Sequence, residues 1–153
     1  MKTFRLITRR ALSEEVEYWL TPVQTLERIH TLVGKESIYA LGNCSRNAKR
    51  IKPQDWICFY NTKKGVVAHA KVVSSPVKER HEAVRDPKGL FPWIFKVSEQ
   101  KLYFDEPIAI DAELRRRLEE FKDRDPLQNW GWYVRSTRKI TKHDFEVLTG
   151  IRT

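Results

Sequence analysis

The sequence predicts a single α+β domain in which a small curved sheet or barrel is flanked by helices. Three observations support this fold class. A chain of 153 residues fits one domain with one core. Hydrophobic residues make up 41% of it, enough for a folded core although 32% of the residues are charged. Short apolar segments with strand-like alternation, separated by loops, outnumber the helical segments.

The first half of the chain contains several strand-like segments and helix starts. Strands are expected at residues 4–8, 37–41, 57–60 and 65–73, and the last two form a hairpin through residues 61–64. Ser13, followed by two acids, predicts a helix start. Thr21-Pro22 predicts a second one, because Pro is favoured at the first helical position. Apolar residues then recur at helical spacing up to Gly34.

The second half continues with strands and two helices. Residues 74–89 are polar and contain Pro and Gly, so they are expected to form a long loop. Strands are predicted at 93–97, 101–104 and 132–134, with a short extended piece at 107–110. Asp111 is expected to cap a helix whose buried side would carry Leu114, Leu118 and Phe121. Thr141 is expected to cap a last helix that ends at Gly150.

Positive charge is concentrated in three acid-free segments of the chain. The formal net charge is +9. Residues 1–10, 42–52 and 131–142 together contain 12 Lys or Arg and no acid, whereas the remaining residues hold 17 basic and 20 acidic side chains. If the fold brings these segments together, they form a basic face for a polyanion such as nucleic acid. Otherwise they are ordinary solvated surface.

Several function classes lack the motifs that their chemistry requires. The sequence has no phosphate-binding GxxxxGK[ST] loop, no GxGxxG, no HExxH and no GxSxG. Its four His and two Cys are scattered, so neither a metal site nor a cofactor is expected. The sequence contains no run of about 18 apolar residues, so no membrane-spanning helix is expected. The two unpaired cysteines fit a reducing cytoplasm. We therefore expect a binding protein rather than an enzyme.

Aromatic residues are interleaved with the basic segments. Tyr39 precedes the second acid-free segment, Phe91 and Trp93 follow the long loop, and a Trp-Tyr pair precedes Arg135. Proteins hold unstacked bases by stacking them on aromatic rings while Arg and Lys take the phosphates. Most Trp and Tyr side chains lie in the core, and Trp56 and Trp132 are expected there, so the residues beside loops are the better candidates.

Residues 39–60 resemble the EVE domain pattern, in which a loop bearing Arg-Asn leads to a Lys-Pro-Gly-Asp turn and an apolar strand that ends in Tyr. Here Gln54 stands where the pattern usually has Gly. Residues 65–72 and 138–145 are similar to the family's next strand and to its closing basic segment. EVE domains belong with YTH and ASCH domains in the PUA-like superfamily, so the resemblance implies a PUA-like small mixed β-barrel flanked by helices. We expect residues 1–153 to form this single domain.

The resemblance also implies a function. YTH domains hold a methylated adenine in an aromatic cage, and EVE-like domains of McrBC-type restriction subunits read modified bases in DNA. By position, the base pocket would comprise Thr8, Arg9, Tyr39, Gly42, Asn43, Ser45, Phe91 and Trp93, with His81 as another candidate for the second aromatic wall. The phosphates would be held by Arg46, Lys49, Arg50, Arg135, Ser136, Arg138 and Lys139.

The leading hypothesis is thus a non-enzymatic reader that holds a flipped, methylated base of DNA. We expect a monomer in isolation, and a larger restriction subunit as a possible setting. Two alternatives stay open. One is a general RNA-binding module for tRNA or rRNA. The other is a small nucleotide-processing enzyme that uses an acid such as Asp55 or Asp86.

Overall fold

The computed structural model describes residues 15–125 and 127–153, which form seven strands and several short helices. The strands are β1 (Tyr18–Val23), β2 (Ile38–Leu41), β3 (Trp56–Asn61), β4 (Gly65–Val72), β5 (Val77–Lys78), β6 (Trp93–Leu102) and β7 (Arg138–Ile140). The helices are α2 (Leu26–Ile29), which continues as a π-helical segment (His30–Lys35), α3 (Ala112–Arg116), α4 (Gly131–Val134) and α5 (Lys142–Thr149). Two 3₁₀ turns, Ala48–Arg50 and Glu119–Phe121, complete the set.

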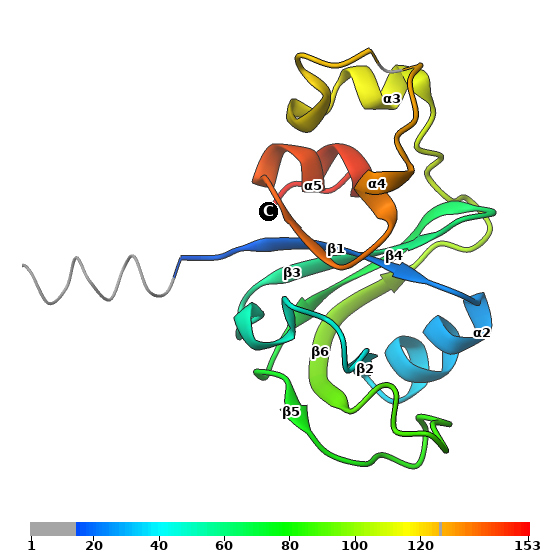
Figure 1. Cartoon of the computed structure of the whole chain (residues 1–153), viewed down its shortest axis with the longest axis vertical. Coiled ribbons are helices and arrows are strands. Elements are labelled where there is room, and N and C mark those ends of the chain that lie inside the picture. The colour runs from blue at the N-terminus through cyan, green and yellow to red at the C-terminus, as the bar shows by residue number, and fades with distance from the viewer. Residues whose placement is uncertain (1–14, 126) are drawn as a thin grey trace, which may run out of the picture.

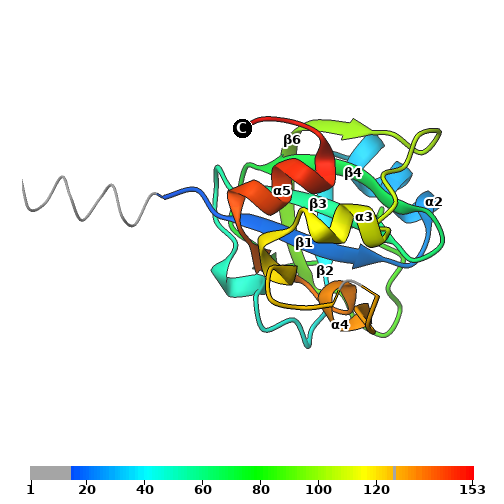
Figure 2. The same cartoon turned by 90° about the horizontal axis from the view of Figure 1, so that it is seen from above.

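The strands form one mixed, curled sheet (Figure 1). Their order is β2-β6-β4-β3-β1-β7, and β5 pairs with β6 beside β2. Strands β1 and β3 run parallel, while the other strand pairs are antiparallel. Helices α3, α4 and α5 lie over one face of the sheet, as the view from above shows (Figure 2). The prediction of an α+β fold with a small, curved mixed sheet and flanking helices is confirmed.

Alternation along the strands creates two hydrophobic clusters, one on each side of the sheet. In β1, Trp19 points into the cluster enclosed by the curled sheet and α2, while Leu20 points toward α3–α5. In β3, Phe59 belongs to the first cluster and Cys58 to the second. Both faces of the central strands are therefore covered. His69 of β4 is accordingly only 4% exposed although it is a polar residue.

Several elements form as predicted. The hairpin of β3 and β4 turns at residues 62–64, and β2 begins one residue later than expected. Asp111 caps α3 by accepting a hydrogen bond from the Leu114 N–H at 2.8 Å. Thr141 caps α5 in the same way, and Gly150 ends that helix with a left-handed backbone (φ 75°). Glycine is favoured there because it lacks the Cβ that makes this conformation costly.

The helix predicted from Thr21-Pro22 is wrong, because these residues lie in β1. Strand β7 pairs only with Tyr18 to Leu20, so one edge of β1 is unpaired at Pro22 and tolerates the missing N–H. The helix begins instead at Leu26, and its cap is Thr25, whose hydroxyl accepts a hydrogen bond from the Arg28 N–H. The expected strand at 4–8 and the helix start at Ser13 lie outside the described residues.

Three further predictions differ from the structure. The expected strand at 132–134 is helix α4, and the last strand is β7. The strands at 93–97 and 101–104 are one strand, β6, which is irregular where Glu99 adopts φ 49°. The long loop at 74–89 contains the two-residue strand β5. In the described part of the chain no helix is long and apolar enough to cross a membrane.

Candidate nucleic-acid interface

A pocket of about 640 Å³ lies where the curled sheet is open, between the end of β1 and the end of β2. Its walls come from residues 21–24 of β1 and the turn after it, Arg28 of α2, residues 39–42 and 44–47, Thr62, Phe91, and residues 135–137 before β7. We call it the β1–β2 pocket. Its volume lies in the range of small-molecule and cofactor sites.

The lining of the β1–β2 pocket is basic. Arg28, Arg46 and Arg135 line it, and none of its lining residues within the described ranges is Asp, Glu or His. Three guanidinium groups without a carboxylate among the lining residues favour an anionic or electron-rich ligand.

Arg28 covers the aromatic wall of the pocket. Its guanidinium carbon lies 4.4 Å from the centroid of the Phe91 ring and 5.5 Å from that of Tyr39. One guanidinium N–H donates to the Ala40 carbonyl oxygen at 2.9 Å, which fixes the group in place. The structure thus puts a planar cation over one face of the Phe91 ring. Arg28 lies outside the three acid-free segments, and Glu27 directly precedes it.

Tyr39 and Phe91, the two aromatic residues of this wall, differ in how much of each ring is exposed. Tyr39 is 3% exposed and packs edge-on against Phe59, with ring centroids 4.8 Å apart. Burial raises the pKa of its phenol, an effect that the nearby Arg28 opposes. Phe91 is partly exposed, and its N–H donates to the Asp86 carboxylate at 2.6 Å. The Phe91 ring is therefore more accessible from the pocket, while the Tyr39 ring is buried behind it.

The acid-free segment at 42–52 reaches its neighbours on both sides. The Asn43 N–H donates to the Leu90 carbonyl oxygen at 2.7 Å, which joins the segment to the Phe91 wall. On the other side, the Asn47 amide donates to the Thr137 carbonyl oxygen at 2.7 Å. The Thr137 hydroxyl in turn lies 2.7 Å from that of Thr21 on β1. Two of the three acid-free segments thus meet at one pocket.

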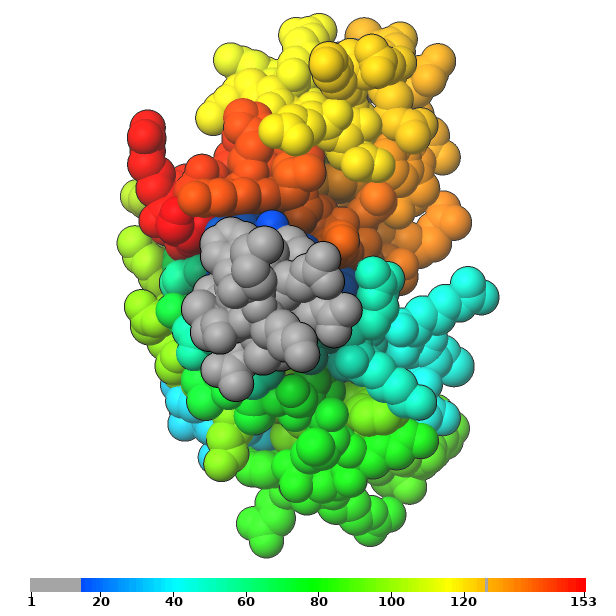
Figure 3. Space-filling model, turned by 90° about the vertical axis from the view of Figure 1, so that its left-hand side faces the viewer, coloured from blue at the N-terminus to red at the C-terminus, as the bar shows by residue number. Residues whose placement is uncertain are grey.

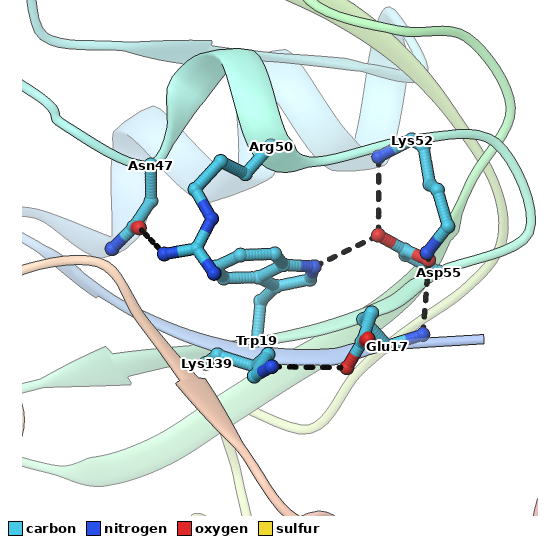
Figure 4. A network of polar contacts seen from close by, with 7 residues as sticks. All are labelled: Glu17, Trp19, Asn47, Arg50, Lys52, Asp55 and Lys139. Atoms are coloured by element: carbon cyan, nitrogen blue, oxygen red, sulfur yellow. Dashed lines mark hydrogen bonds and ion pairs between the residues drawn. The ribbon is translucent and has the colours of Figure 1, made fainter. Parts of the chain in front are cut away.

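A buried carboxylate anchors the end of the same segment (Figure 4). Asp55 is fully buried and accepts hydrogen bonds from the indole N–H of Trp19 at 2.9 Å and the backbone N–H groups of Glu17 and Lys52. The Lys52 ammonium lies 2.9 Å from the same carboxylate. With four donors converging on it, Asp55 has a structural role.

The predicted site residues fall into groups. Tyr39, Gly42, Ser45 and Phe91 line the β1–β2 pocket, as do Arg46, Arg135 and Ser136. Asn43 and Trp93 are not among its lining residues, and Thr8 and Arg9 lie outside the described residues. Lys49 and Arg50 are exposed on the 3₁₀ turn beside the pocket.

Arg138 and Lys139 each have an acidic partner. Arg138 contacts Glu120 at 3.3 Å, and its guanidinium lies over the rings of Trp132 and Tyr133. Lys139 lies 3.7 Å from Glu17 and is about half exposed. These two side chains are therefore less available to phosphates than Arg46 or Arg135, which are exposed and have no acidic partner among the described residues.

A second hollow, of about 700 Å³, lies under the 74–92 loop and shares Phe91 with the first. Its walls include Glu79, His81, Glu82 and Asp86, so it lacks the uniform positive charge of the β1–β2 pocket. His81 lines this hollow and not the β1–β2 pocket. Within the described ranges, no group of three or more His, Cys, Asp or Glu residues is placed to hold a metal ion.

Solved structures share this fold at low sequence identity. The YTH domain of the Zygosaccharomyces rouxii MRB1 protein in complex with N6-methyladenosine RNA aligns with a TM-score of 0.62 and 14% identity, over 92% of this chain and 89% of that chain. The YTH domain-containing protein mmi1 in an RNA complex aligns with a TM-score of 0.59 and 12% identity, over 89% and 80%. A hypothetical protein from Leishmania major aligns with a TM-score of 0.53 and 16% identity, over 86% and 91%.

At the level of sequence, the comparison with curated proteins gives no match. The family model of the EVE domain, by contrast, matches residues 17–151, which include the whole curled sheet, the β1–β2 pocket and helices α2 to α5. The match and the shared fold agree with the pattern seen in residues 39–60. This chain belongs to the EVE domain family.

Proposed function

We propose that this domain is a non-enzymatic reader that holds one unstacked, modified base of a nucleic acid in the β1–β2 pocket. The observation that supports this most directly is the lining of the pocket, where three arginines and a partly exposed Phe91 meet without any acid among the residues that the structure describes. The aromatic ring and the Arg28 guanidinium supply flat surfaces for a base. Arg46 and Arg135 supply charge for the flanking phosphates.

The energetics of such a site are reasonable. Taking a base out of a stack costs a few kcal/mol. Stacking on an aromatic ring contributes roughly 1–3 kcal/mol, and hydrogen bonds from guanidinium groups to base or phosphate oxygens add to it. A modification that removes a base pair or adds apolar surface lowers the cost of extrusion and increases contact with Phe91. The pocket would therefore favour modified over unmodified bases.

An enzymatic role has less support from the geometry. Asp55 is fully buried and saturated with donors, and Asp86 accepts hydrogen bonds from the N–H groups of Leu90 and Phe91. Neither acid lines the β1–β2 pocket. Both candidates for a nucleotide-processing reaction are thus engaged in holding backbone, which favours binding over catalysis.

The nucleic acid that the domain binds could be DNA or RNA, and we rank the two as follows. Modified DNA is our leading proposal, and a place in a modification-dependent restriction subunit would require it. RNA is the second candidate, because three of the similar YTH structures are RNA complexes and one of these contains N6-methyladenosine. A general RNA-binding role would use the same basic loops without a preference for modification.

The test is a binding panel of DNA and RNA oligonucleotides, single- and double-stranded, with and without methylated bases, at two salt concentrations. We expect tighter binding of one modified oligonucleotide, and affinity that falls as salt rises. Equal binding of modified and unmodified oligonucleotides would contradict the reader function, and binding of RNA alone would contradict the DNA proposal.

Two variants and a matched control sharpen the panel. Phe91→Ala should remove the preference for modification, whereas Arg135→Ala should weaken every oligonucleotide by a similar factor. Arg116→Ala, which removes an exposed arginine of α3 that does not line the pocket, should leave binding unchanged. If Phe91→Ala and Arg135→Ala change the panel in the same way, the assignment of a base pocket is wrong.

A further inference from the structure

Trp93 lies outside the β1–β2 pocket and has an unusual set of neighbours. It is the first residue of β6 and is partly exposed. The Lys78 ammonium lies 5.2 Å from the centroid of its ring, and that of Lys49 lies 5.9 Å away. Both lysines are exposed, and neither forms an ion pair with any residue that the structure describes. One indole thus gathers two unpaired cations.

The two lysines come from separate parts of the chain. Lys49 belongs to the 3₁₀ turn Ala48–Arg50, whereas Lys78 belongs to β5, which pairs with the start of β6 so that Lys78 is opposite Trp93. The segments around residue 50 and around β5 both face the viewer in the space-filling view, where the cyan-green and green surfaces adjoin (Figure 3). Two like charges held near each other repel, so the arrangement favours an anion between them.

This cluster lies next to the β1–β2 pocket. Trp93 pairs with Leu41 of β2, and Leu41 lines the pocket. Phe91, which forms the open wall of the pocket, is two residues before Trp93, so their Cα atoms are at most about 7 Å apart. Neighbouring nucleotides in a stacked strand are about 3.4 Å apart along the helix axis, and an unstacked step is longer. The separation therefore suits two consecutive nucleotides.

We infer that Trp93, Lys49 and Lys78 form a second subsite, which stacks the base next in the strand to the one in the β1–β2 pocket. The indole supplies the stacking surface, and the two ammonium groups bind the phosphates on either side of that base. A base reaches the ring by displacing an exposed lysine side chain, which is flexible and then turns to the phosphate. This inference rests on the proposed reader function and extends it from one nucleotide to at least two.

The experiment measures binding of two probes, N6-methyladenosine monophosphate and a single-stranded nine-nucleotide RNA with one central N6-methyladenosine, together with the equivalent DNA 9-mer. Trp93→Ala should weaken the 9-mer that binds the wild-type protein by about 5- to 150-fold. It should leave the monophosphate unchanged, because a single nucleotide occupies only the pocket. Trp93→Phe should restore most of the binding.

Trp93 packs against the core, so Trp93→Ala can also weaken binding by destabilising the fold. The two exposed lysines therefore give a second, independent measurement. Lys49→Ala and Lys78→Ala should each reduce the slope of log affinity against log salt by about 0.7. The control Lys64→Ala removes an exposed lysine from the β3–β4 turn and should change nothing.

The outcomes separate the two proposals. If Phe91→Ala weakens the 9-mer while Trp93→Ala and both lysine variants bind it like the wild type, the second subsite is wrong and the reader function stands. If Trp93→Ala weakens the monophosphate as much as the 9-mer, Trp93 belongs to the pocket and the separate subsite is again wrong. If the wild-type protein binds neither 9-mer nor any modified oligonucleotide of the panel, the reader function fails and the subsite with it.

Discussion

The side-chain amide of Asn47 donates a hydrogen bond to the carbonyl oxygen of Thr137, 2.7 Å away and 90 residues later in the sequence. This contact joins two basic segments that the chain places far apart. It lies beside Arg46 on one side and Arg135 and Ser136 on the other, all of which line the β1–β2 pocket. Asn47 therefore positions the basic rim of the pocket.

Replacing Asn47 tests this positioning role. Asn47→Ala should lower the free energy of unfolding by about 1 kcal/mol, the usual contribution of one hydrogen bond. Asn47→Asp should weaken nucleic-acid binding further than Asn47→Ala, because it sets a carboxylate against the Thr137 carbonyl oxygen in an acid-free pocket. Urea unfolding and the binding panel give the two readouts, with the exposed Gln128→Ala as control. Unchanged binding by both Asn47 variants would contradict the role.

Arg28 gives a second prediction. Arg28→Lys keeps the positive charge but loses the planar group that lies 4.4 Å from the Phe91 centroid, so it cannot stack in the same way. We expect Arg28→Lys to reduce the preference for a modified base while leaving the salt dependence of binding unchanged. Arg28→Ala should reduce both. A lysine variant that keeps the full preference would show that only the charge of Arg28 matters.

Much of the fold follows from local patterns in the sequence. Two short apolar segments joined by a polar turn predict β3 and β4, and the capping residues Asp111 and Thr141 predict where α3 and α5 begin. The prediction fails at residues 132–134, since a short aromatic run suits a strand or a helix equally well. It fails at Pro22 as well, because only the short pairing of β7 shows that this edge of β1 is open.

The site is predictable to a similar degree. The acid-free segments and the resemblance indicate Tyr39, Arg46 and Arg135, and the fold brings all three to one pocket. Arg28 is missed because its role arises where α2 meets β2, a contact between elements that no local pattern reveals. Trp93 is expected in the pocket because it follows the long loop and by the resemblance, yet it is not among the pocket's lining residues. Such distinctions depend on tertiary packing.

The buried carboxylate of Asp55 gives a prediction about stability. Four donors converge on its two oxygens, and an amide in the same place offers one acceptor oxygen instead of two. Asp55→Asn should therefore lower the free energy of unfolding by about 3 kcal/mol, measured by urea denaturation. The exposed Asp123→Asn is the matched control. A loss below about 0.5 kcal/mol, typical of an ordinary surface substitution, would show that Asp55 does not anchor the segment.

Gln54 stands where the EVE pattern usually has Gly, and its φ of 79° is the reason that Gly is favoured there. A residue with a Cβ pays about 1 kcal/mol or more in this region, while Gly adopts it freely at the cost of a more flexible unfolded chain. Gln54→Gly should raise the free energy of unfolding by roughly 0.5 kcal/mol. Gln54→Val, with a branched side chain, should lower it. Thermal unfolding of both variants measures the difference, and destabilisation by Gly would contradict the explanation.

His69 gives the protein a pH-dependent stability. It lies between Trp56, Tyr103 and Phe145, with its Nδ1 3.2 Å from the Tyr103 hydroxyl oxygen. Burial, and secondarily the positive charge of Lys101, lower the pKa of His69 from 6.5 to about 4. The folded state thus favours the neutral ring. The neutral His69 ring makes its full contribution to the free energy of unfolding above pH 6.5. As the pH falls from about 6.5 toward 4, up to about 3 kcal/mol of that contribution is lost.

Urea unfolding between pH 7.5 and pH 4 measures this dependence. His69→Phe keeps an aromatic ring but cannot take up a proton, so its stability should fall less steeply over that interval than that of the wild type. The control His30→Gln removes an exposed histidine and should preserve the wild-type slope. If His69→Phe and the wild type show parallel curves, other groups cause the acid sensitivity. A shallower curve for His69→Phe alone would assign the acid sensitivity to the buried His69 ring. This ring lies on the side of the sheet that faces α5, away from the β1–β2 pocket.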